Sequence, residues 1–176
     1  MSQRKQSFAP VVSAETRVLI LGSLPGERSL EAGQYYAHPR NLFWSLLEGV
    51  LDTELVRLSY QDRLEAILHH GIGLWDSVRS ARRSGSLDSA MRDVEGADLP
   101  ALVSGLPNLR AVAFNGKTSE RVGKPQVAEL PVDFLTLPSS SPAYAAMPLY
   151  EKQARWLVLK DYLARDFLET PSAQDH

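Results

Sequence analysis

One apolar strand that ends at a glycine and proline turn constrains the fold of this chain more than any other feature. Residues 17–21 favour β-structure and are apolar at most positions, which is typical of a strand buried on both faces of its sheet. The turn Gly22-Ser23-Leu24-Pro25-Gly26 follows at once. In open α/β sheets, ligands bind just outside the carboxyl ends of the strands. The turn therefore predicts the rim of a binding pocket.

A second strand, far away in the sequence, ends in the same way. Residues 132–137 run directly into Pro138-Ser139-Ser140-Ser141-Pro142. Helical and strand patterns alternate along the chain, which favours a three-layer α/β/α fold around a mainly parallel central sheet. The other expected elements are helices over 41–51, 60–70, 98–105 and 148–168, a helix from about 118, a strand over 109–114, a short apolar piece over 71–76 and a long loop with a helical turn over 79–96.

Length and composition indicate one globular domain. The chain has 176 residues, of which 44% are hydrophobic and 23% charged, as in an ordinary globular protein with a single core. We expect one domain over residues 1–176, with flexible ends at 1–15 and 170–176. The absence of cysteine excludes disulfides and thiolate chemistry and fits a cytoplasmic location. No apolar run approaches the roughly 20 residues that span a bilayer, and nothing demands more than a monomer.

Neither strand-end turn matches a common cofactor or nucleophile motif. The first turn lacks both the G-x-G-x-x-G spacing of dinucleotide sites and the G-K-[ST] of a P-loop. No H-E-x-x-H occurs, and the four histidines have no metal-ligand spacing, so we expect neither a metal nor a cofactor. The serines at 139–141 lack the G-x-S-x-G elbow of serine hydrolases. They are therefore either turn serines or hydroxyls that bind phosphate.

Charged and aromatic residues leave two interpretations open. The net charge is −2, so a nucleic-acid partner would need a local basic patch. The spacing of Phe43 and Trp44 predicts core positions on a helix, whereas Tyr36 precedes that helix in a loop, where its ring can stack on a base. Two basic clusters are candidates either for a nucleic-acid contact or for a solvated face, namely Arg79, Arg82 and Arg83, and Arg40, Lys117, Arg121 and Lys124.

Five short segments, taken in order, resemble motifs of the uracil-DNA glycosylase superfamily. The nearest branches are the mismatch-specific uracil/thymine glycosylases and the hypoxanthine-DNA (deoxyinosine) glycosylases. The resemblance implies the fold of that superfamily and excision of a base that has been flipped out of the DNA. The matching segments are Gly22-Ser23-Leu24-Pro25-Gly26, His38-Pro39-Arg40-Asn41-Leu42-Phe43-Trp44, Gly71-Ile72-Gly73-Leu74-Trp75-Asp76, Phe114-Asn115-Gly116-Lys117 and Leu137-Pro138-Ser139-Ser140-Ser141-Pro142.

This chain departs from these motifs at two positions, and the departures limit which base we expect it to excise. In the mismatch-specific branch an asparagine in the first turn positions the attacking water, whereas this chain has Leu24, which cannot form such a hydrogen bond. Other branches begin the second loop with histidine or asparagine, where this chain has Leu137. The hypoxanthine branch lacks the usual first-turn residue and relies on an asparagine that matches Asn41. The resemblance thus implies a monofunctional deoxyinosine glycosylase with Asn41 as catalytic residue, although asparagine there also suits a helix N-cap.

The resemblance also implies roles for the other site residues. The flipped base would stack on Tyr36, contact the backbone around Gly22, Ser23 and Leu24, and lie above Asn115. Serines 139–141 would hold the flanking phosphates. The expected partner is DNA that contains deaminated bases. Contacts to DNA outside the base pocket are expected from Ser139, Ser140, Ser141, Ala143, Tyr144, Lys117, Arg40 and His38.

Three alternatives remain at this point. The first is a mismatch-directed uracil glycosylase that tolerates Leu24 and Leu137, for which Leu24→Asn should raise uracil excision. The second is a relative that binds DNA without catalysis. The third is a small-molecule hydrolase that uses one of the three serines, although no partner base can be identified for it in the sequence.

Overall fold

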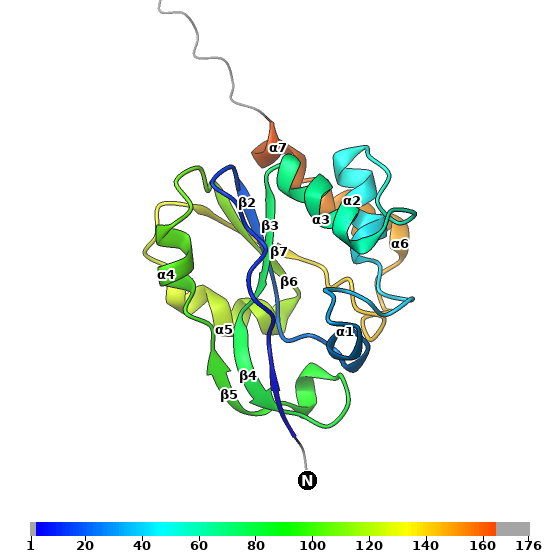
Figure 1. Cartoon of the computed structure of the whole chain (residues 1–176), viewed down its shortest axis with the longest axis vertical. Coiled ribbons are helices and arrows are strands. Elements are labelled where there is room, and N and C mark those ends of the chain that lie inside the picture. Colours follow the sequence, from blue (N-terminus) through cyan, green and yellow to red (C-terminus); the bar gives the residue numbers. More distant parts are fainter. Residues whose placement is uncertain (1–2, 165–176) are drawn as a thin grey trace, which may run out of the picture.

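Four parallel strands form the central sheet of the computed structural model, which describes residues 3–164 (Figure 1). The strand order is β3-β2-β6-β7, with β2 at Val18–Gly22, β3 at Ile72–Asp76, β6 at Ala111–Asn115 and β7 at Asp133–Leu137. Every residue of β2 and β6 is buried, because these strands lie in the middle of the sheet. The predicted parallel sheet is confirmed, and the apolar piece over 71–76 supplies one of its strands.

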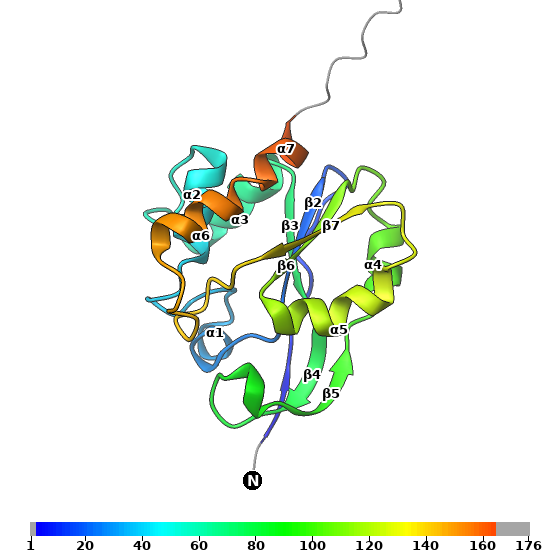
Figure 2. The same ribbon diagram turned by 180° about the vertical axis from the view of Figure 1, so that it is seen from behind.

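Helices cover both faces of this sheet, which gives three layers (Figure 2). In β2, Val18 and Ile20 pack into one layer, while Leu19 and Leu21 pack into the other, since successive strand residues point to opposite faces. The predicted α/β/α architecture is therefore confirmed. The first face carries α2 (Phe43–Leu51), α3 (Tyr60–His69), α6 (Leu149–Trp156) and α7 (Leu159–Leu163), and the second carries α4 (Leu99–Ser104) and α5 (Lys117–Val127).

A second, antiparallel sheet lies beside the first and corrects one prediction. Its strand order is β1-β4-β5, with β1 at Arg4–Gln6, β4 at Val78–Arg82 and β5 at Arg92–Gly96. The sequence predicted a long loop with a helical turn over 79–96; the loop is wrong because two strands lie there, whereas a helical turn is present. All five residues of β5 are exposed, so this strand has no apolar alternation that sequence patterning could detect. A short 3-10 turn, Asp88–Ala90, connects β4 to β5.

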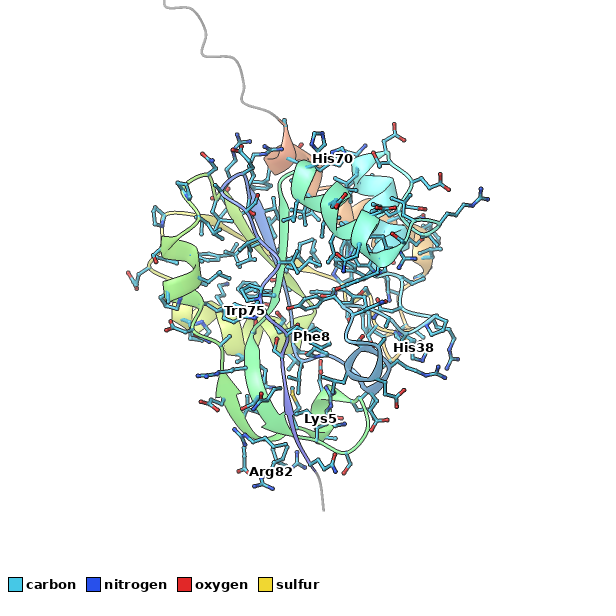
Figure 3. All side chains as sticks on the ribbon, in the orientation of Figure 1. Lys5, Phe8, His38, His70, Trp75 and Arg82 are labelled. Atoms are coloured by element: carbon cyan, nitrogen blue, oxygen red, sulfur yellow. The ribbon has the colours of Figure 1, made fainter. Side chains whose placement is uncertain are left out.

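The amino-terminal segment is also more ordered than predicted. Residues 4–6 pair with β4, and Val11 pairs with Leu74 of β3. The Trp75 indole donates a hydrogen bond to the Phe8 carbonyl at 2.8 Å (Figure 3). The expectation of a flexible end over residues 1–15 is therefore wrong for the described residues, because backbone pairing with distant strands is invisible in the local sequence. The end predicted at 170–176 lies outside the described residues.

Helix boundaries follow local signals in α4 and depart from them near the carboxyl end of the chain. Asp98 caps α4 by accepting a hydrogen bond from the Ala101 amide at 3.2 Å, as aspartate at this position favours. The expected single helix over 148–168 is instead α6 and α7. Between them, the Lys160 amide bonds to the Leu157 carbonyl three residues earlier, which tightens the turn. Residues 165–168 lie outside the described part.

Within residues 3–164, none of the helices combines the length and apolar character needed to cross a bilayer.

Candidate active site

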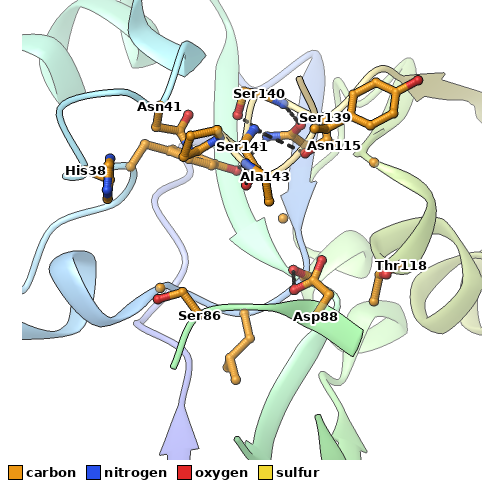
Figure 4. Close-up of a pocket in the computed structure, with 18 of the residues that line it drawn as sticks. His38, Asn41, Ser86, Asp88, Asn115, Thr118, Ser139, Ser140, Ser141 and Ala143 are labelled. Atoms are coloured by element: carbon orange, nitrogen blue, oxygen red, sulfur yellow. Dashed lines mark hydrogen bonds between the residues drawn. The ribbon is translucent and has the colours of Figure 1, made fainter. Parts of the chain in front are cut away.

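A cavity of about 520 Å³ opens at the carboxyl ends of all four parallel strands (Figure 4). The last residue of each strand lines it, namely Gly22, Asp76, Asn115 and Leu137. Gly22 is the register partner of Asp76 on β3, and Asn115 is the register partner of Leu137 on β7. This is where ligands bind in open α/β sheets, and its volume lies in the range of small-molecule sites.

The structure brings nearly all of the predicted site residues to this one cavity. Arg40 is the exception, since it is exposed and does not line the cavity. Arg83, from one of the two basic clusters, is buried and therefore cannot contact DNA. The predicted residues that line the cavity are Gly22, Ser23, Leu24, Tyr36, His38, Asn41, Asn115, Lys117, Ser139, Ser140, Ser141, Ala143 and Tyr144.

One side of the cavity, here called the amide wall, consists of Asn41, Asn115 and the serines at 139–141 (Figure 4). Asn115 and Ser140 are both buried and bond reciprocally. The Asn115 amide donates to the Ser140 hydroxyl at 2.9 Å, and the Ser140 backbone amide donates to Asn115 Oδ1 at 2.9 Å. This pair fixes the serine loop to the end of β6.

The other two serines of the amide wall act as turn residues. Ser139 Oγ accepts a hydrogen bond from the Ser141 amide at 3.1 Å, and Ser141 Oγ accepts one from the Ala143 amide at 3.2 Å. Such side-chain to backbone bonds stabilise tight turns. Each of these two hydroxyl groups still has its own hydrogen to donate, which suits contact with an anion.

Asn41 lies just before α2 and is not its N-cap, because the N-cap position is taken by Leu42. The Asn41 Oδ1 accepts a hydrogen bond from the Phe43 amide at 3.0 Å, two residues further on, so the side chain stabilises the turn that leads into the helix. The next residue, Leu42, donates its amide to the Ser140 carbonyl at 3.0 Å, which joins the two loops. Because an amide oxygen has two lone pairs, Asn41 can offer both its NH₂ group and the second lone pair of Oδ1 to a ligand in the cavity.

Tyr36 is held on one face and has a polar contact at its tip. Its ring stacks on Phe43 at a centroid distance of 3.7 Å and an angle of 12°. The Asn115 amide nitrogen lies 3.4 Å from its hydroxyl. Burial raises the pKa of Tyr36 above its ordinary value, so the hydroxyl stays protonated. Phe43 and Trp44 are buried in the core, as predicted, and a flat ligand could reach only the other face of Tyr36.

A second group of residues that line the cavity, here called the carboxyl wall, consists of Ser23, Asp76 and Asp88. Ser7 donates a hydrogen bond to Asp76 Oδ2 at 2.7 Å, and Ser23 donates one to Asp88 Oδ1 at 2.7 Å. Burial raises the pKa of Asp76 to about 7 and also raises the pKa of Asp88. The structure therefore gives the cavity two carboxyl groups with perturbed ionisation.

Sequence reasoning assigned no role to either carboxyl group. Asp76 had a signal, because it directly follows an apolar piece that leads into a polar turn. Asp88 had none, since it lies in the segment that was predicted to be a loop and reaches the cavity only through the second sheet.

A buried arginine holds the backbone of the turn that carries Ser23. Arg83 donates hydrogen bonds to the carbonyls of Pro25 and Gly85 and contacts that of Leu24. The Leu24 side chain packs in an apolar cluster with Val78, Ala81 and Met91. The backbone of Leu24 is therefore fixed at the cavity, while its side chain contributes to the core of the second sheet.

Comparison with known proteins identifies the family. The model of the uracil DNA glycosylase superfamily matches residues 9–161, which is most of the chain. The chain belongs to this superfamily. Both of the strand-end segments singled out in the sequence, the turn 22–26 and the loop 137–142, lie within the matched residues and meet at the cavity.

Two relatives of this glycosylase share the narrower name "Hypoxanthine DNA glycosylase". The protein from Methanosarcina barkeri is 45% identical over 116 residues, which cover 66% of this chain and 73% of the relative. The protein from Methanosarcina acetivorans is 37% identical over 139 residues, which cover 79% of this chain and 87% of the relative.

A solved structure has the same fold as this glycosylase. The solution NMR structure of a candidate uracil DNA glycosylase from Methanosarcina acetivorans superimposes with a TM-score of 0.82. The match covers 93% of this chain and all of that one, at 32% sequence identity.

Proposed function

We propose that this protein is a monofunctional DNA glycosylase that removes deaminated bases from DNA, above all hypoxanthine from deoxyinosine, by hydrolysing the N-glycosidic bond. The observation that carries the proposal is the single cavity at the strand ends, which collects an aromatic face, amide donors and two carboxyl groups. The two relatives named hypoxanthine DNA glycosylase support the choice of base.

The base enters this cavity only after the nucleotide has flipped out of the helix, because stacking and pairing otherwise cover the bond to be broken. The free face of Tyr36 offers a stacking surface for the flipped ring. The backbone of Gly22, Ser23 and Leu24 and the amide of Asn115 line the space around its edge.

Hydrolysis passes through a sugar with oxocarbenium character, as in the cleavage of other glycosidic bonds. Such a step needs a positioned water and stabilisation of the departing base. Asn41 contributes the positioned donor. Its NH₂ group can orient water or the base, while its Oδ1 accepts the Phe43 amide. As a neutral amide, Asn41 does not remove a proton.

The rim of the cavity supplies contacts to the DNA on either side of the flipped nucleotide. The hydroxyls of Ser139 and Ser141 and the exposed Lys117 at the start of α5 suit phosphate oxygens. Tyr144 is 39% exposed and lies with Ala143 on the loop that could fill the space vacated by the base. His38 accepts the Arg40 amide in its own turn and faces the same rim.

The test uses oligonucleotides that carry one deoxyinosine, one deoxyxanthosine or one deoxyuridine. Each is incubated with the protein and then treated with alkali, which cuts the strand at an abasic site. We expect scission at deoxyinosine, faster than at deoxyuridine, and its loss in Asn41→Ala. Scission mainly at deoxyuridine would favour a mismatch-directed uracil glycosylase. Binding without scission at any base would favour a non-catalytic relative.

A further inference from the structure

Asp76 is a buried carboxyl group that takes no part in the positioning of water or the stacking of the base proposed above. It is the last residue of β3, is 3% exposed and lines the cavity. One of its oxygens, Oδ2, accepts the Ser7 hydroxyl at 2.7 Å. Among the described residues, no side-chain hydrogen bond is made by the other oxygen, Oδ1.

Gly22 keeps this second oxygen accessible from the cavity. Gly22 is the register partner of Asp76 on the adjacent strand. A Cβ atom at position 22 would lie 2.6 Å from Asp76 Oδ1 and 3.0 Å from the Tyr36 hydroxyl. Any side chain there would cover or displace the carboxyl group. The glycine at the end of β2 therefore leaves room in which a ligand atom can approach Oδ1.

The groups around Asp76 disfavour its charged form. Burial is the main cause, and Asp88, also in the carboxyl wall, adds the repulsion of a second carboxyl group. Tyr35 and Tyr36 face it from the loop between α1 (Glu27–Ala32) and α2, and both have a raised pKa themselves.

Two groups favour the charged form of Asp76, each less strongly than burial disfavours it. They are the Ser7 hydroxyl and the more distant Arg83, and the guanidinium of Arg83 is engaged by backbone carbonyls. The pKa of Asp76 is raised to about 7 as a result. A carboxyl group of this kind can hold a proton near neutral pH and give it up there.

We propose that Asp76 is the general acid of base excision and donates its proton to the departing purine. This rests on the proposed function. The Oδ1–H proton passes to N7 of hypoxanthine while the C1′–N9 bond breaks and its electron pair moves into the ring. Water adds to C1′ and loses a proton to solvent, and the Asp76 carboxylate takes up a proton again. Deoxyinosine and water thus give an abasic site and neutral hypoxanthine.

This assignment accounts for a purine preference in a pocket of this family. N7 of hypoxanthine is a hydrogen-bond acceptor, as it is in guanine. Uracil, bound to the sugar through N1, has no basic ring nitrogen to receive the proton. The acid at position 76 would therefore accelerate the loss of a purine far more than the loss of uracil.

The experiment pairs a side-chain change with a change of one substrate atom. Single-turnover excision is measured for wild type and Asp76→Asn, on DNA with deoxyinosine and on DNA with 7-deaza-deoxyinosine, which lacks N7. We expect Asp76→Asn to slow deoxyinosine excision by about 100-fold or more, in the range of general acid catalysis. On the 7-deaza substrate, wild type should be similarly slow and the substitution should have little further effect.

A purely structural role for Asp76 predicts a different pattern. Both substrates would then slow by the same factor in Asp76→Asn, and this result would overturn the proposal. If wild type excises the 7-deaza base as fast as hypoxanthine, the proposal also fails, and this comparison needs no variant to fold. If Asp76→Asn leaves deoxyinosine excision unchanged, the acid role fails while the glycosylase function stands. If wild type releases no hypoxanthine, the function itself fails and the acid role with it.

Ser7→Ala supplies a matched control. Ser7 lies on the amino-terminal segment outside the cavity and acts on Asp76 through its hydroxyl. Its hydrogen bond favours the carboxylate, so its loss should raise the pKa of Asp76. Excision by an acid decreases as pH rises through that pKa, and the midpoint of this decrease should move to higher pH in Ser7→Ala. An unchanged midpoint would count against Asp76 as the titrating acid.

Discussion

The amide wall and the carboxyl wall of the cavity satisfy their polar groups in different ways. In the amide wall, Asn115 and Ser140 bond to each other twice, and all of the partners are neutral. In the carboxyl wall, Asp76 and Asp88 each accept one hydroxyl hydrogen bond, and their charge is disfavoured by burial. Neutral groups that hydrogen-bond to one another keep the same geometry at any pH, whereas buried carboxyl groups change their protonation state with pH.

This difference separates the residues that fix the geometry of the site from the residues that can bind and release a proton. In the amide wall, Asn115 at the end of β6 bonds to Ser140 and to the Tyr36 hydroxyl, and the Leu42 amide, next to Asn41, bonds to the Ser140 carbonyl. The carboxyl wall comes from the end of β3, the turn after β2 and the connection between β4 and β5, and it is the part that can hold a proton. The effects of substitutions in the two walls should therefore differ in their pH dependence as well as in their magnitude.

The largest expected effect comes from the donor in the amide wall. Asn41→Asp keeps an oxygen that can accept the Phe43 amide and therefore keeps the turn before α2, but it removes the NH₂ group. Deoxyinosine excision should decrease by about 100- to 1,000-fold, as for other preorganised donors. Thermal unfolding of the variant serves as the control for this turn. Excision within a few fold of wild type would show that Asn41 acts only by stabilising the turn.

The second-largest expected effect is a pH-dependent change in the free energy of unfolding that is caused by Asp76. A carboxyl group whose pKa is raised in the folded state stabilises the fold fully below its unfolded value of 3.8, and this contribution is lost as pH rises toward about 7. Wild type should therefore lose about 3 kcal/mol relative to Asp76→Asn between pH about 5 and pH about 8. Urea unfolding of both proteins at the two pH values measures it. Parallel pH curves would mean that Asp76 ionises freely in the folded protein.

The substitution Leu24→Asn distinguishes between two predictions, one made from the family motif and one made from side-chain packing. The family motif alone predicts a gain in uracil excision. The cluster of Leu24 with Val78, Ala81 and Met91 predicts instead a loss of about 2 kcal/mol in unfolding free energy, because an amide would replace a packed apolar side chain. No gain in uracil release should accompany it. A variant of wild-type stability that excises uracil faster would show that this side chain reaches the cavity.

Ser140→Ala weakens the amide wall without adding charge. It removes the hydroxyl that accepts the Asn115 amide and leaves that amide with only the Tyr36 hydroxyl, 3.4 Å away. We expect a loss of about 1 kcal/mol in unfolding free energy, equal at acidic and at neutral pH. Ser141→Ala is the control, since Ser141 is less buried. A pH-dependent loss in Ser140→Ala would show that the two walls are electrostatically coupled.

The smallest effect concerns the rim. Lys117 lines the cavity mouth and is exposed, whereas Arg40 lies outside the cavity. Lys117→Ala should weaken binding to DNA with an uncleavable deoxyinosine analogue, and the slope of log K against log salt should become shallower by about 1. Arg40→Ala should change the slope less. Equal changes in both variants would indicate that the DNA surface extends beyond the cavity rim.

The sequence by itself determined the parallel sheet and the place of the site. Strands such as residues 18–21 are buried on both faces, so they must be apolar throughout, and this pattern is readable locally. The ends of parallel strands lie at one edge of the sheet, so the order of residues alone assigns the turn 22–26 and the loop 138–142 to one pocket. The same reasoning correctly gave the core positions of Phe43 and Trp44.

Only the tertiary structure decided the carboxyl wall. Asp76 receives its hydrogen bond from Ser7, 69 residues away, and Asp88 receives its bond from Ser23, 65 residues away. Ser7 directly follows β1, and Asp88 lies in the connection between β4 and β5. The second sheet that these strands form is largely exposed and charged, so it has no apolar period to reveal it. Apolar burial leaves a repeating signal in the sequence, whereas a hydrogen bond or a pKa depends on partners that only the folded chain brings together.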